Sequence, residues 1–541
     1  MKDISSTGSF VDFTLENFIY VDKTVYIPQL VKLKRVFISR PRRFGKSLTL
    51  DTIATLFETG VEPYFKGTWI YDKWTEPTYP VLRLNFLNFD KNSLEKFNNK
   101  LNSKITEFAE LNQVTTYKEK EEAEDSIDHL LEQLRLEGRQ IVVLIDEYDC
   151  QMTANINNET LYKQFQEKIK SFYANIKDKF AIKFLGITGV TRLKDVAIFS
   201  VGSDINDITN DSAYSQMIGF TRDEIKKYYI DYLKLAASYE NNCTVDNVTE
   251  AQIESLLDRL AKNYDGYCFD EFYKKKVFST WSVNKFFQSV VSNKFVYFGE
   301  YWYDNGGLPS ILVNYLKTHE LNIFEYLDKD KFLKVSSDDF KNPTALTTIN
   351  QNVLMCQTGY LTLRSDLNKT STVALGIPNG EIYKALNRLL ANNIFKGNTD
   401  ITDDYGRSLL EVGTVDDIIN LFNSALNSVS YDNYPIVSES SVQNMLKLYL
   451  LGAHQEVLSE VHEAKGRADL VVNTDNRRIV FEFKYAKNEA EAKSKLSEAV
   501  EQIKTRDYGN ILPKKNELIR IAAVFNADPK VRAFTENQIV P

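Results

Sequence analysis

The stretch Ser39-Arg40-Pro41-Arg42-Arg43-Phe44-Gly45-Lys46-Ser47 follows the apolar run Val36-Phe37-Ile38 and precedes a helical pattern. A strand, a glycine-containing turn and a helix in this order direct backbone N–H groups and the positive end of the helix dipole at one point. Gly45 allows an anion to approach the backbone, Lys46 supplies a counter-charge, and the Ser47 hydroxyl suits Mg²⁺. The stretch therefore predicts a phosphate-binding turn inside an α/β fold.

The general pattern for such a turn is GxxxxGK[ST], and the last three positions match it. Arg40 stands where the first glycine is expected, so the strict pattern fails. Arg42 and Arg43 could add charge-assisted hydrogen bonds to phosphate. Taken alone, the stretch is interpreted more simply as a basic turn that ends in glycine, and a second motif is needed to favour nucleotide binding.

That second motif is Ile141-Val142-Val143-Leu144-Ile145-Asp146-Glu147, an apolar strand that ends in two carboxylates. Asp146 is predicted to hold Mg²⁺ through water, and Glu147 to polarise the attacking water. Thr188 or Thr191, at the end of the next strand, could sense the γ-phosphate from a strand that lies between the two motifs. Together the two motifs favour binding of a nucleoside triphosphate, with ATP as the expected cofactor.

The order of segments indicates several domains. Residues 1–215 alternate strand-like and helical segments, which predicts a parallel α/β sheet; strands are expected at Val36–Ile38, Pro80–Phe86, Ile141–Ile145 and Phe184–Val190. Residues 216–395 are predicted to form a helical lid and a mixed middle region, and 396–435 a linker. Residues 436–541 follow the order helix, three strands, helix, strand. The charged stretch Lys118–Asp125 is expected on the solvated face of a helix.

A second cluster of reactive side chains is expected near the C-terminus. Asp469 lies in one strand of a predicted hairpin, and Arg477–Lys484 form the other. Because side chains alternate along a strand, Glu482 and Lys484 share one face, while the phenylalanines beside them share the other. A charged pair inside a central strand is costly unless it is used or paired.

Two carboxylates and a lysine that converge in this way can hydrolyse a phosphodiester. Asp469 and Glu482 offer hard oxygen ligands to Mg²⁺, which lowers the pKa of a bound water. Lys484 would orient that water and stabilise the developing charge. The simpler alternative is a surface hairpin with an ordinary Glu–Lys pair, because the bare pattern is common.

Composition limits the environment and the partners. The chain has 541 residues, a hydrophobic share of 43% and a net charge of −8, which argues against a surface that is basic throughout. The four cysteines and four histidines lack zinc-ligand spacing. No signal peptide and no apolar run of ~18 residues is present. We expect a soluble cytoplasmic protein without membrane contact, and a homo-oligomer stays open.

The chain resembles the bacterial AAA-ATPase-like family, whose members usually carry a PD-(D/E)XK nuclease domain at the C-terminus. The resemblance covers almost the whole chain and rests on short stretches: Val21-Asp22-Lys23-Thr24, Ser39 to Ser47, Thr188 to Arg192, Ile198-Phe199-Ser200, Tyr264-Asp265-Gly266-Tyr267, Trp281-Ser282-Val283-Asn284, Gln357 to Thr362 and Ile377-Pro378-Asn379-Gly380-Glu381. Within this family the departure at Arg40 is normal. The resemblance implies an ATP-binding domain in the first 215 residues.

Residues 436–541 resemble the PD-(D/E)XK fold in its RecB-like branch. Asp469 matches the aspartate of that motif, and Glu482-Phe483-Lys484 match its ExK segment. The resemblance implies further site residues: Glu439 in the first helix, Glu460 as a second candidate ligand, and the trailing pair Gln502 and Tyr508. Gln443 occupies the position where a histidine is usual.

These inferences lead to one expected function and two alternatives. The expected function is ATP binding and hydrolysis by the N-terminal domain, with Mg²⁺-dependent cleavage of nucleic acid, DNA being favoured, by the C-terminal domain. The first alternative is a nucleoside-triphosphate-dependent switch that binds nucleic acid without cutting it. The second is an interaction scaffold with neither activity, against which the intact Lys46, Asp146, Asp469, Glu482 and Lys484 argue.

Overall fold

The computed structural model describes residues 1–541 except 177–178, 194–204, 303–309, 317–318, 320–322, 344, 396–405, 454, 464–465 and 512–513. The side chains at 310, 456, 459, 460, 462 and 463 also lie outside the described part. The chain divides into two compact units, one formed by Met1–His319 with Phe332–Ile382 and the other by Glu320–Lys331 with Tyr383–Pro541. The finer division at residues 215, 395 and 435 stays a prediction.

The first unit is built on a five-stranded sheet in the order β2-β3-β4-β1-β5. All of its pairings are parallel, as the strand–helix alternation predicts. The strands are β1 (Arg35–Ser39), β2 (Val81–Asn85), β3 (Ile141–Asp146), β4 (Ile182–Gly189) and β5 (Asn206–Asp207). The four strands expected from the sequence are confirmed, and β4 lies between β3 and β1 as predicted.

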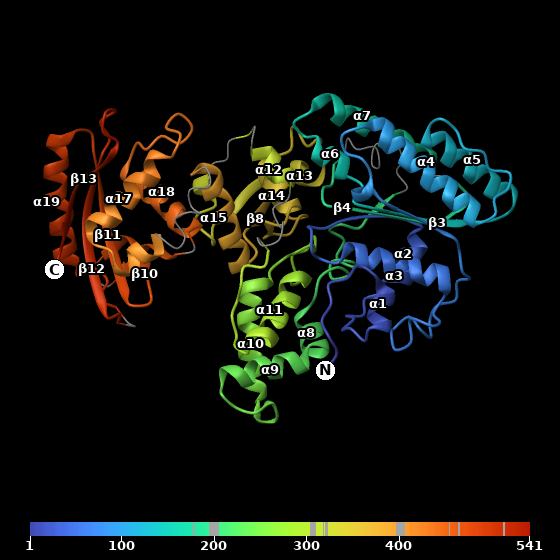
Figure 1. Cartoon of the computed structure of the whole chain (residues 1–541), viewed down its shortest axis with the longest axis horizontal. Coiled ribbons are helices and arrows are strands. Elements are labelled where there is room, and N and C mark those ends of the chain that lie inside the picture. The colour runs from blue at the N-terminus through green and yellow to red at the C-terminus, as the bar shows by residue number, and fades with distance from the viewer. Residues whose placement is uncertain are drawn as a thin grey trace. The chain divides into compact units, whose positions relative to one another are not determined.

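Helices cover both faces of this sheet (Figure 1). In that view α4, α5 and α7 lie above the strands, and α2 and α3 lie below them. The helices are α1 (Phe10–Leu15), α2 (Ile27–Leu33), α3 (Lys46–Thr59), α4 (Leu94–Leu111), α5 (Ala123–Leu136), α6 (Cys150–Ala154) and α7 (Glu159–Ile176). Every residue of β3 is buried, which explains its unbroken apolar sequence.

The sequence prediction for Lys118–Asp125 is wrong in its first part, because α5 begins only at Ala123. The preceding residues form a loop whose carbonyls are bound by side chains of α4. The amide of Asn102 donates to the carbonyls of Lys120 and Glu121 at 3.0 Å. These contacts satisfy the backbone outside a helix.

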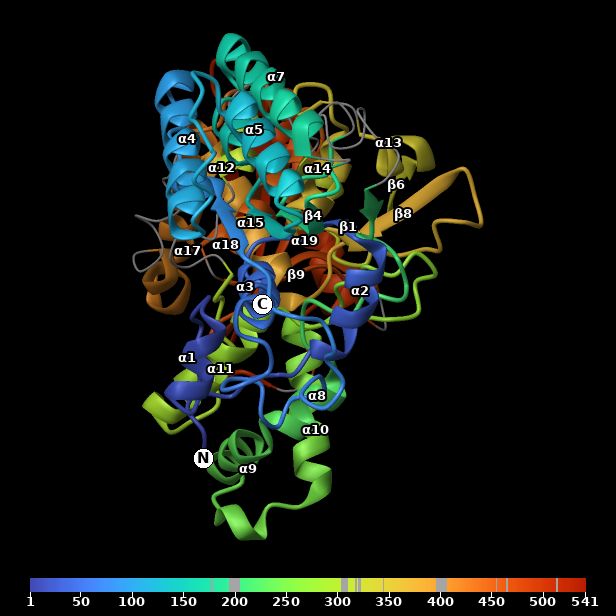
Figure 2. The same ribbon diagram turned by 90° about the vertical axis from the view of Figure 1, so that its right-hand side faces the viewer.

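The middle of the chain completes the first unit. Figure 2 shows α8 to α11 grouped together below the sheet. The helices are α8 (Arg222–Tyr228), α9 (Ile230–Glu240), α10 (Glu250–Tyr264), α11 (Thr280–Asn293), α12 (Ser310–Leu316), α13 (Ser337–Lys341) and α14 (Gln351–Gln357). A three-stranded antiparallel sheet follows, in the order β6 (Leu333–Ser336), β8 (Thr372–Gly376), β7 (Thr362–Leu363). The helical and mixed character predicted for this region is confirmed.

The second unit contains another five-stranded sheet, in the order β13-β12-β11-β10-β9. Its elements are α17 (Val415–Asn427), α18 (Glu439–Gly452), β9 (Glu456–Glu463), β10 (Gly466–Asn473), β11 (Arg477–Ala486), α19 (Glu489–Arg506), β12 (Glu517–Asn526) and β13 (Ala533–Ile539). Helix α15 (Gly380–Ile394) comes before them in the chain, and the division between the two units falls within it, after Ile382. The predicted order is confirmed, with β13 as an additional edge strand. Helix α19 packs on one face of β11 through Ala499 and Ile503.

Among the described residues, no helix combines the length and the apolar character needed to cross a lipid bilayer.

Candidate functional site

The predicted phosphate-binding turn connects β1 to α3. Gly45 has a φ of 103°, a left-handed conformation that suits glycine, and α3 begins at the next residue. Because the first turn of a helix has unpaired backbone N–H groups, this geometry presents donors to an anion. The hydroxyl of Ser47 is exposed in the first turn of α3.

Lys46 is almost fully buried, with an exposed fraction of 4%. Its ammonium donates to the carbonyls of Arg40 at 3.1 Å and Pro41 at 3.2 Å, and lies 3.6 Å from the Glu147 carboxylate. The lysine is therefore held across the turn, where a phosphate could replace Glu147 as its counter-charge.

Asp146 connects the turn to the two neighbouring strands. Its carboxylate accepts hydrogen bonds from the hydroxyls of Ser47, at 2.6 Å, and Thr188. Thr191 instead donates to Asp149 at 2.6 Å. Of the two threonines left open by the sequence, Thr188 is thus the one beside Asp146, and the paired hydroxyl and carboxylate oxygens suit Mg²⁺.

Glu147 follows β3 with a φ of 52°, which is uncommon for a residue with a side chain. Burial raises the pKa of its carboxyl above the ordinary value, the nearby Lys46 lowers it, and the charges of Asp149 and Asp146 raise it again, with a net rise. A carboxyl with a raised pKa beside the phosphate-binding lysine is suited to accept a proton from water.

Glu147→Gln is expected to retain ATP binding and to slow ATP turnover by about 10²-fold. The amide keeps the shape of the side chain but cannot accept the proton of the attacking water. Nucleotide affinity and phosphate release measured on the same preparation test this expectation. Turnover at the wild-type rate would remove Glu147 from the hydrolytic step.

The three arginines of the turn have different surroundings. Arg40 is 1% exposed; it donates to the carbonyls of Ser39 and Thr209 and packs over the Phe269 ring at 4.1 Å. Burial lowers the pKa of Arg40 to about 9. This side chain ties the turn to the segment after β5, which gives a structural reason for an arginine at the first glycine position.

Arg43 donates to the carbonyls of Tyr301 at 2.7 Å and Trp302 at 3.0 Å, and its guanidinium lies over the Trp281 ring. Its charge is thus engaged by the middle region, and the role predicted for it at a phosphate stays untested. Arg42 is half-buried, and its charge acts on the Glu147 carboxyl. The positive charge of Arg42 lowers the pKa of the Glu147 carboxyl.

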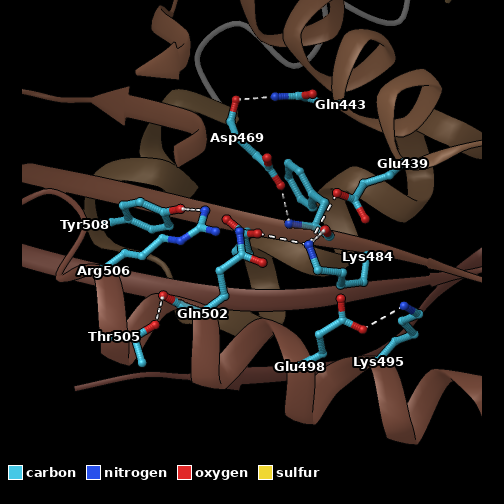
Figure 3. A network of polar contacts seen from close by, with 12 residues as sticks. Glu439, Gln443, Asp469, Lys484, Lys495, Glu498, Gln502, Thr505, Arg506 and Tyr508 are labelled. Carbon is cyan, nitrogen blue, oxygen red and sulfur yellow. Dashed lines mark hydrogen bonds and ion pairs between the residues drawn. The ribbon is translucent and has the colours of Figure 1, made fainter. Parts of the chain in front are cut away.

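The second predicted site lies on the central strand of the other sheet (Figure 3). β11 pairs with β10 in antiparallel register, with Leu470 opposite Phe481. The Phe483 N–H donates to the Asp469 carboxylate at 2.8 Å, which draws that carboxylate towards β11. The Lys484 ammonium donates to Glu482 at 2.9 Å and lies 3.3 Å from Glu439.

Burial shapes the electrostatics of this cluster. Glu482 is fully buried and Lys484 is 6% exposed. Burial, followed by repulsion from Asp469, raises the pKa of Glu482 to about 7, and burial also raises the pKa of Asp469. Burial lowers the pKa of Lys484, but attraction to Glu482 and its neighbours outweighs this effect and leaves it raised. A further cation near these carboxyl groups would therefore stabilise their ionised forms.

The donor set can be compared with the needs of a metal ion. Across the described ranges, no group of three or more His, Cys, Asp or Glu side chains is arranged to hold one. The pair Asp469 and Glu482 does offer hard oxygen ligands, and Glu482 Oε2 is buried with no hydrogen-bond partner. An orphaned carboxylate oxygen beside a second carboxylate fits a divalent ion that takes its other ligands from water or substrate.

The remaining predicted residues surround this cluster in part. Glu439 opens α18 near Lys484, and the Gln443 side chain donates to the Asp469 carbonyl. Gln502 extends from α19 towards the cluster (Figure 3). Tyr508 is fully buried just after α19. Glu460 lies in β9, and its side chain is outside the described part.

Comparison with known proteins agrees with the two predicted domains. Residues 5–199 match the family described as "Predicted AAA-ATPase", and residues 437–535 match the "PD-(D/E)XK nuclease superfamily". The chain combines an AAA-ATPase-like domain with a PD-(D/E)XK-superfamily domain. The resemblance inferred from the sequence is thereby confirmed.

Two further similarities were found. An "Uncharacterized protein in vnfD 5'region" of Azotobacter chroococcum mcd 1 is 26% identical over 534 residues, which cover 95% of this chain and 94% of the relative. The crystal structure of Cdc6p from Pyrobaculum aerophilum aligns with 11% identity over 68% of this chain and 91% of that chain, at a TM-score of 0.25. This TM-score is too low to define a common fold.

Several of the stretches that carry the AAA-ATPase-like resemblance contact one another or the predicted phosphate-binding turn. Glu381 accepts hydrogen bonds from the Ser282 hydroxyl at 2.7 Å and the Trp302 N–H at 2.8 Å. A Cβ at Gly359 would lie 2.8 Å from Pro41 of the turn. The stretch Ile198-Phe199-Ser200 lies outside the described residues. Sequence reasoning did not select Glu381, because its partners are distant in the chain and no spacing signals a buried carboxyl.

Glu381→Gln is expected to stabilise the first compact unit, to which Glu381 belongs, at high pH. Burial raises the pKa of Glu381 from 4.5 to about 8. The free energy of unfolding of the wild type therefore falls as the pH rises from about 4.5 to 8. The amide keeps an acceptor without the charge, so the variant should match wild type at pH 5 and exceed it by a few kcal/mol at pH 9. Urea unfolding at both pH values is the measurement; an equal difference at both would contradict the assignment.

Proposed function

We propose that the protein binds and hydrolyses ATP through its AAA-ATPase-like domain and cleaves phosphodiester bonds of nucleic acid, DNA being favoured, through its PD-(D/E)XK domain with Mg²⁺. The observation that carries the nuclease proposal is the convergence of Asp469, Glu482 and Lys484 on one buried face of β10 and β11. Shifted pKa values that arise from burial and from a specific charged partner, as at Glu482, cluster at functional sites.

The chemistry follows from these residues. A divalent ion held by Asp469 and Glu482 would supply a water of lowered pKa and neutralise charge on the phosphate. Lys484 holds a positive charge at Glu482, from where it can orient the attacking water and stabilise the oxyanion. Burial of the cluster strengthens both interactions, because the local dielectric is low.

ATP binding is supported by the space beside the turn. A cavity of about 160 Å³ beside the turn is lined by residues that include Gly45, Leu48, Trp281 and Asn284. Ile19, Tyr20 and Val21 add apolar lining. A mostly apolar cavity next to a phosphate-binding helix N-terminus suits the base and sugar of a nucleotide.

A second candidate function is a nucleoside-triphosphate-dependent switch that binds nucleic acid without cutting it. The observation that favours it is the ammonium of Lys484, which lies 2.9 Å from Glu482 and 3.3 Å from Glu439 and so offsets part of their negative charge. Binding and cutting would use the same surface, so only an activity measurement separates the two functions.

The experiment uses the purified full chain with labelled single- and double-stranded DNA and RNA, with and without Mg²⁺ and ATP. Cleavage that needs Mg²⁺ supports the proposal, and the substrate that is cut fastest identifies the nucleic acid. Binding without cleavage in Mg²⁺ and in Mn²⁺, with or without ATP, would favour the switch. A matched series with Lys46→Ala tells whether ATP acts through the AAA-ATPase-like domain.

A further inference from the structure

Arg506 is the last residue of α19, and nothing in the sequence motifs assigns it a role. Its guanidinium donates to the Tyr508 hydroxyl at 2.7 Å. Figure 3 shows it extending from the end of α19 towards the side of the sheet that carries Asp469 and Lys484. The hydrogen bond to Tyr508, and then the charges of Glu482 and Asp469, raise the pKa of Arg506. The arginine therefore belongs to the electrostatic surroundings of the candidate nuclease site.

Hydrogen bonds fix the two residues that follow Arg506. Asp507 ends α19 in a left-handed conformation, with a φ of 50°. Arg520 of β12 donates to the Tyr508 carbonyl at 2.7 Å and to the Asp507 carboxylate at 2.6 Å. Tyr508 is fully buried, so its hydroxyl is a fixed acceptor. A long side chain held in this way loses little entropy when it binds a ligand.

The first residue of β10, Gly466, leaves room for this side chain. A Cβ at Gly466 would lie 2.6 Å from Arg506 Cδ, closer than real Cβ atoms approach other atoms. Gly466 thus allows the arginine stem to pass the start of the strand that carries Asp469. The packing of the stem against β10 and the hydrogen bond to Tyr508 are independent contacts that fix the same side chain.

Charge decides what the guanidinium can bind. The nearby lysine is already engaged, because Glu482 and Glu439 both lie within 3.3 Å of the Lys484 ammonium. Arg506 is half-buried, and its hydrogen bond to Tyr508 is the only one that its guanidinium makes among the side chains that the structure describes. With respect to the described side chains, most of its N–H groups are available, in a fork that matches two oxygens of a phosphate.

We propose that Arg506 binds a backbone phosphate of the nucleic acid on the α19 side of the Asp469–Lys484 cluster, and that Tyr508 positions its guanidinium. The proposal rests on the proposed nuclease function, because it takes the substrate of that site to be a phosphodiester chain. It also gives Tyr508 a physical role that burial alone does not supply. Without Arg506, the phosphate would meet a face dominated by carboxylates.

The test measures binding of a labelled oligonucleotide to the full chain in EDTA, where cleavage cannot interfere, across a series of salt concentrations. Arg506→Gln is expected to weaken binding about tenfold and to reduce the slope of log affinity against log salt by about one. Lys504→Gln is the control. It makes the same charge change on an exposed side of α19, since two helical positions differ by about 200°. Its affinity and slope should stay near wild type.

Tyr508→Phe separates positioning from charge. This variant keeps the arginine, so its salt slope should equal that of wild type, while its affinity falls severalfold because the guanidinium loses its anchor. An unchanged affinity and slope in Arg506→Gln would overturn the proposal, and so would a lower melting temperature with an unchanged slope. Failure of the wild type to cut any substrate would refute the nuclease function but leave this binding measurement decisive for Arg506.

Discussion

Asp469→Ala is expected to slow Mg²⁺-dependent cleavage of nucleic acid by about 10²-fold or more. The carboxylate is one of the two that the structure offers to a metal, and it lies on the strand next to Glu482. Lys484→Ala should have an effect of similar size, because it removes the charge that stabilises the developing oxyanion. Single-turnover rates on a labelled substrate measure both.

The folded state should tolerate Asp469→Ala. The Phe483 N–H loses an acceptor at 2.8 Å, but Glu482 loses a repelling neighbour. Nucleic-acid binding should persist or tighten, because one negative charge leaves the surface that faces the phosphates. Asp475→Ala is the matched control, since Asp475 is exposed in the turn between β10 and β11. Cleavage by Asp469→Ala at the wild-type rate would refute the catalytic assignment.

Lys46→Ala is expected to abolish ATP binding in the micromolar range. The lysine is the charge that the turn holds towards a phosphate, and it is fixed by the carbonyls of Arg40 and Pro41. Its loss removes the larger of the two positive charges that act on Glu147, so repulsion from this carboxylate disfavours an anion in the turn. Equilibrium binding of a fluorescent ATP analogue is the measurement.

Lys104→Ala controls for the removal of a lysine from the same unit, because the Lys104 side chain is 39% exposed on α4 and is paired with Glu107. It should bind the analogue as wild type does. Unchanged affinity in Lys46→Ala would mean that the turn does not bind phosphate, and the AAA-ATPase-like domain would then need another nucleotide site.

The parts of the fold that the sequence predicted are those with strong local periodicity. β3 is an unbroken apolar run, and β11 alternates charged and aromatic residues, so both strands and their faces could be inferred directly. The pairing of Glu482 with Lys484 followed from that alternation. Thr188 could not be separated from Thr191 in this way, because the choice depends on which carboxylate each hydroxyl meets.

The parts that could not be predicted depend on contacts between distant segments. The charges at Lys118–Glu122 suggest a helix, yet Asn102 of α4 holds the segment as a loop. The hydrogen bonds from Arg43 to the carbonyls of Tyr301 and Trp302 could not be predicted either, because these residues are distant in the sequence. Arg506 gave no signal, because its role depends on Tyr508 and on the space at Gly466.

The most direct test of the central claim is cleavage by the wild-type chain after its metal is removed and restored. The protein is treated with EDTA, assayed on the labelled substrate, and assayed again after Mg²⁺ is added in excess. Cleavage should be absent in EDTA and return with Mg²⁺, and Asp469→Ala should stay inactive under both conditions. Cleavage that persists in EDTA, or that never appears with Mg²⁺ or Mn²⁺ on any nucleic acid, would contradict a metal-dependent nuclease at Asp469, Glu482 and Lys484.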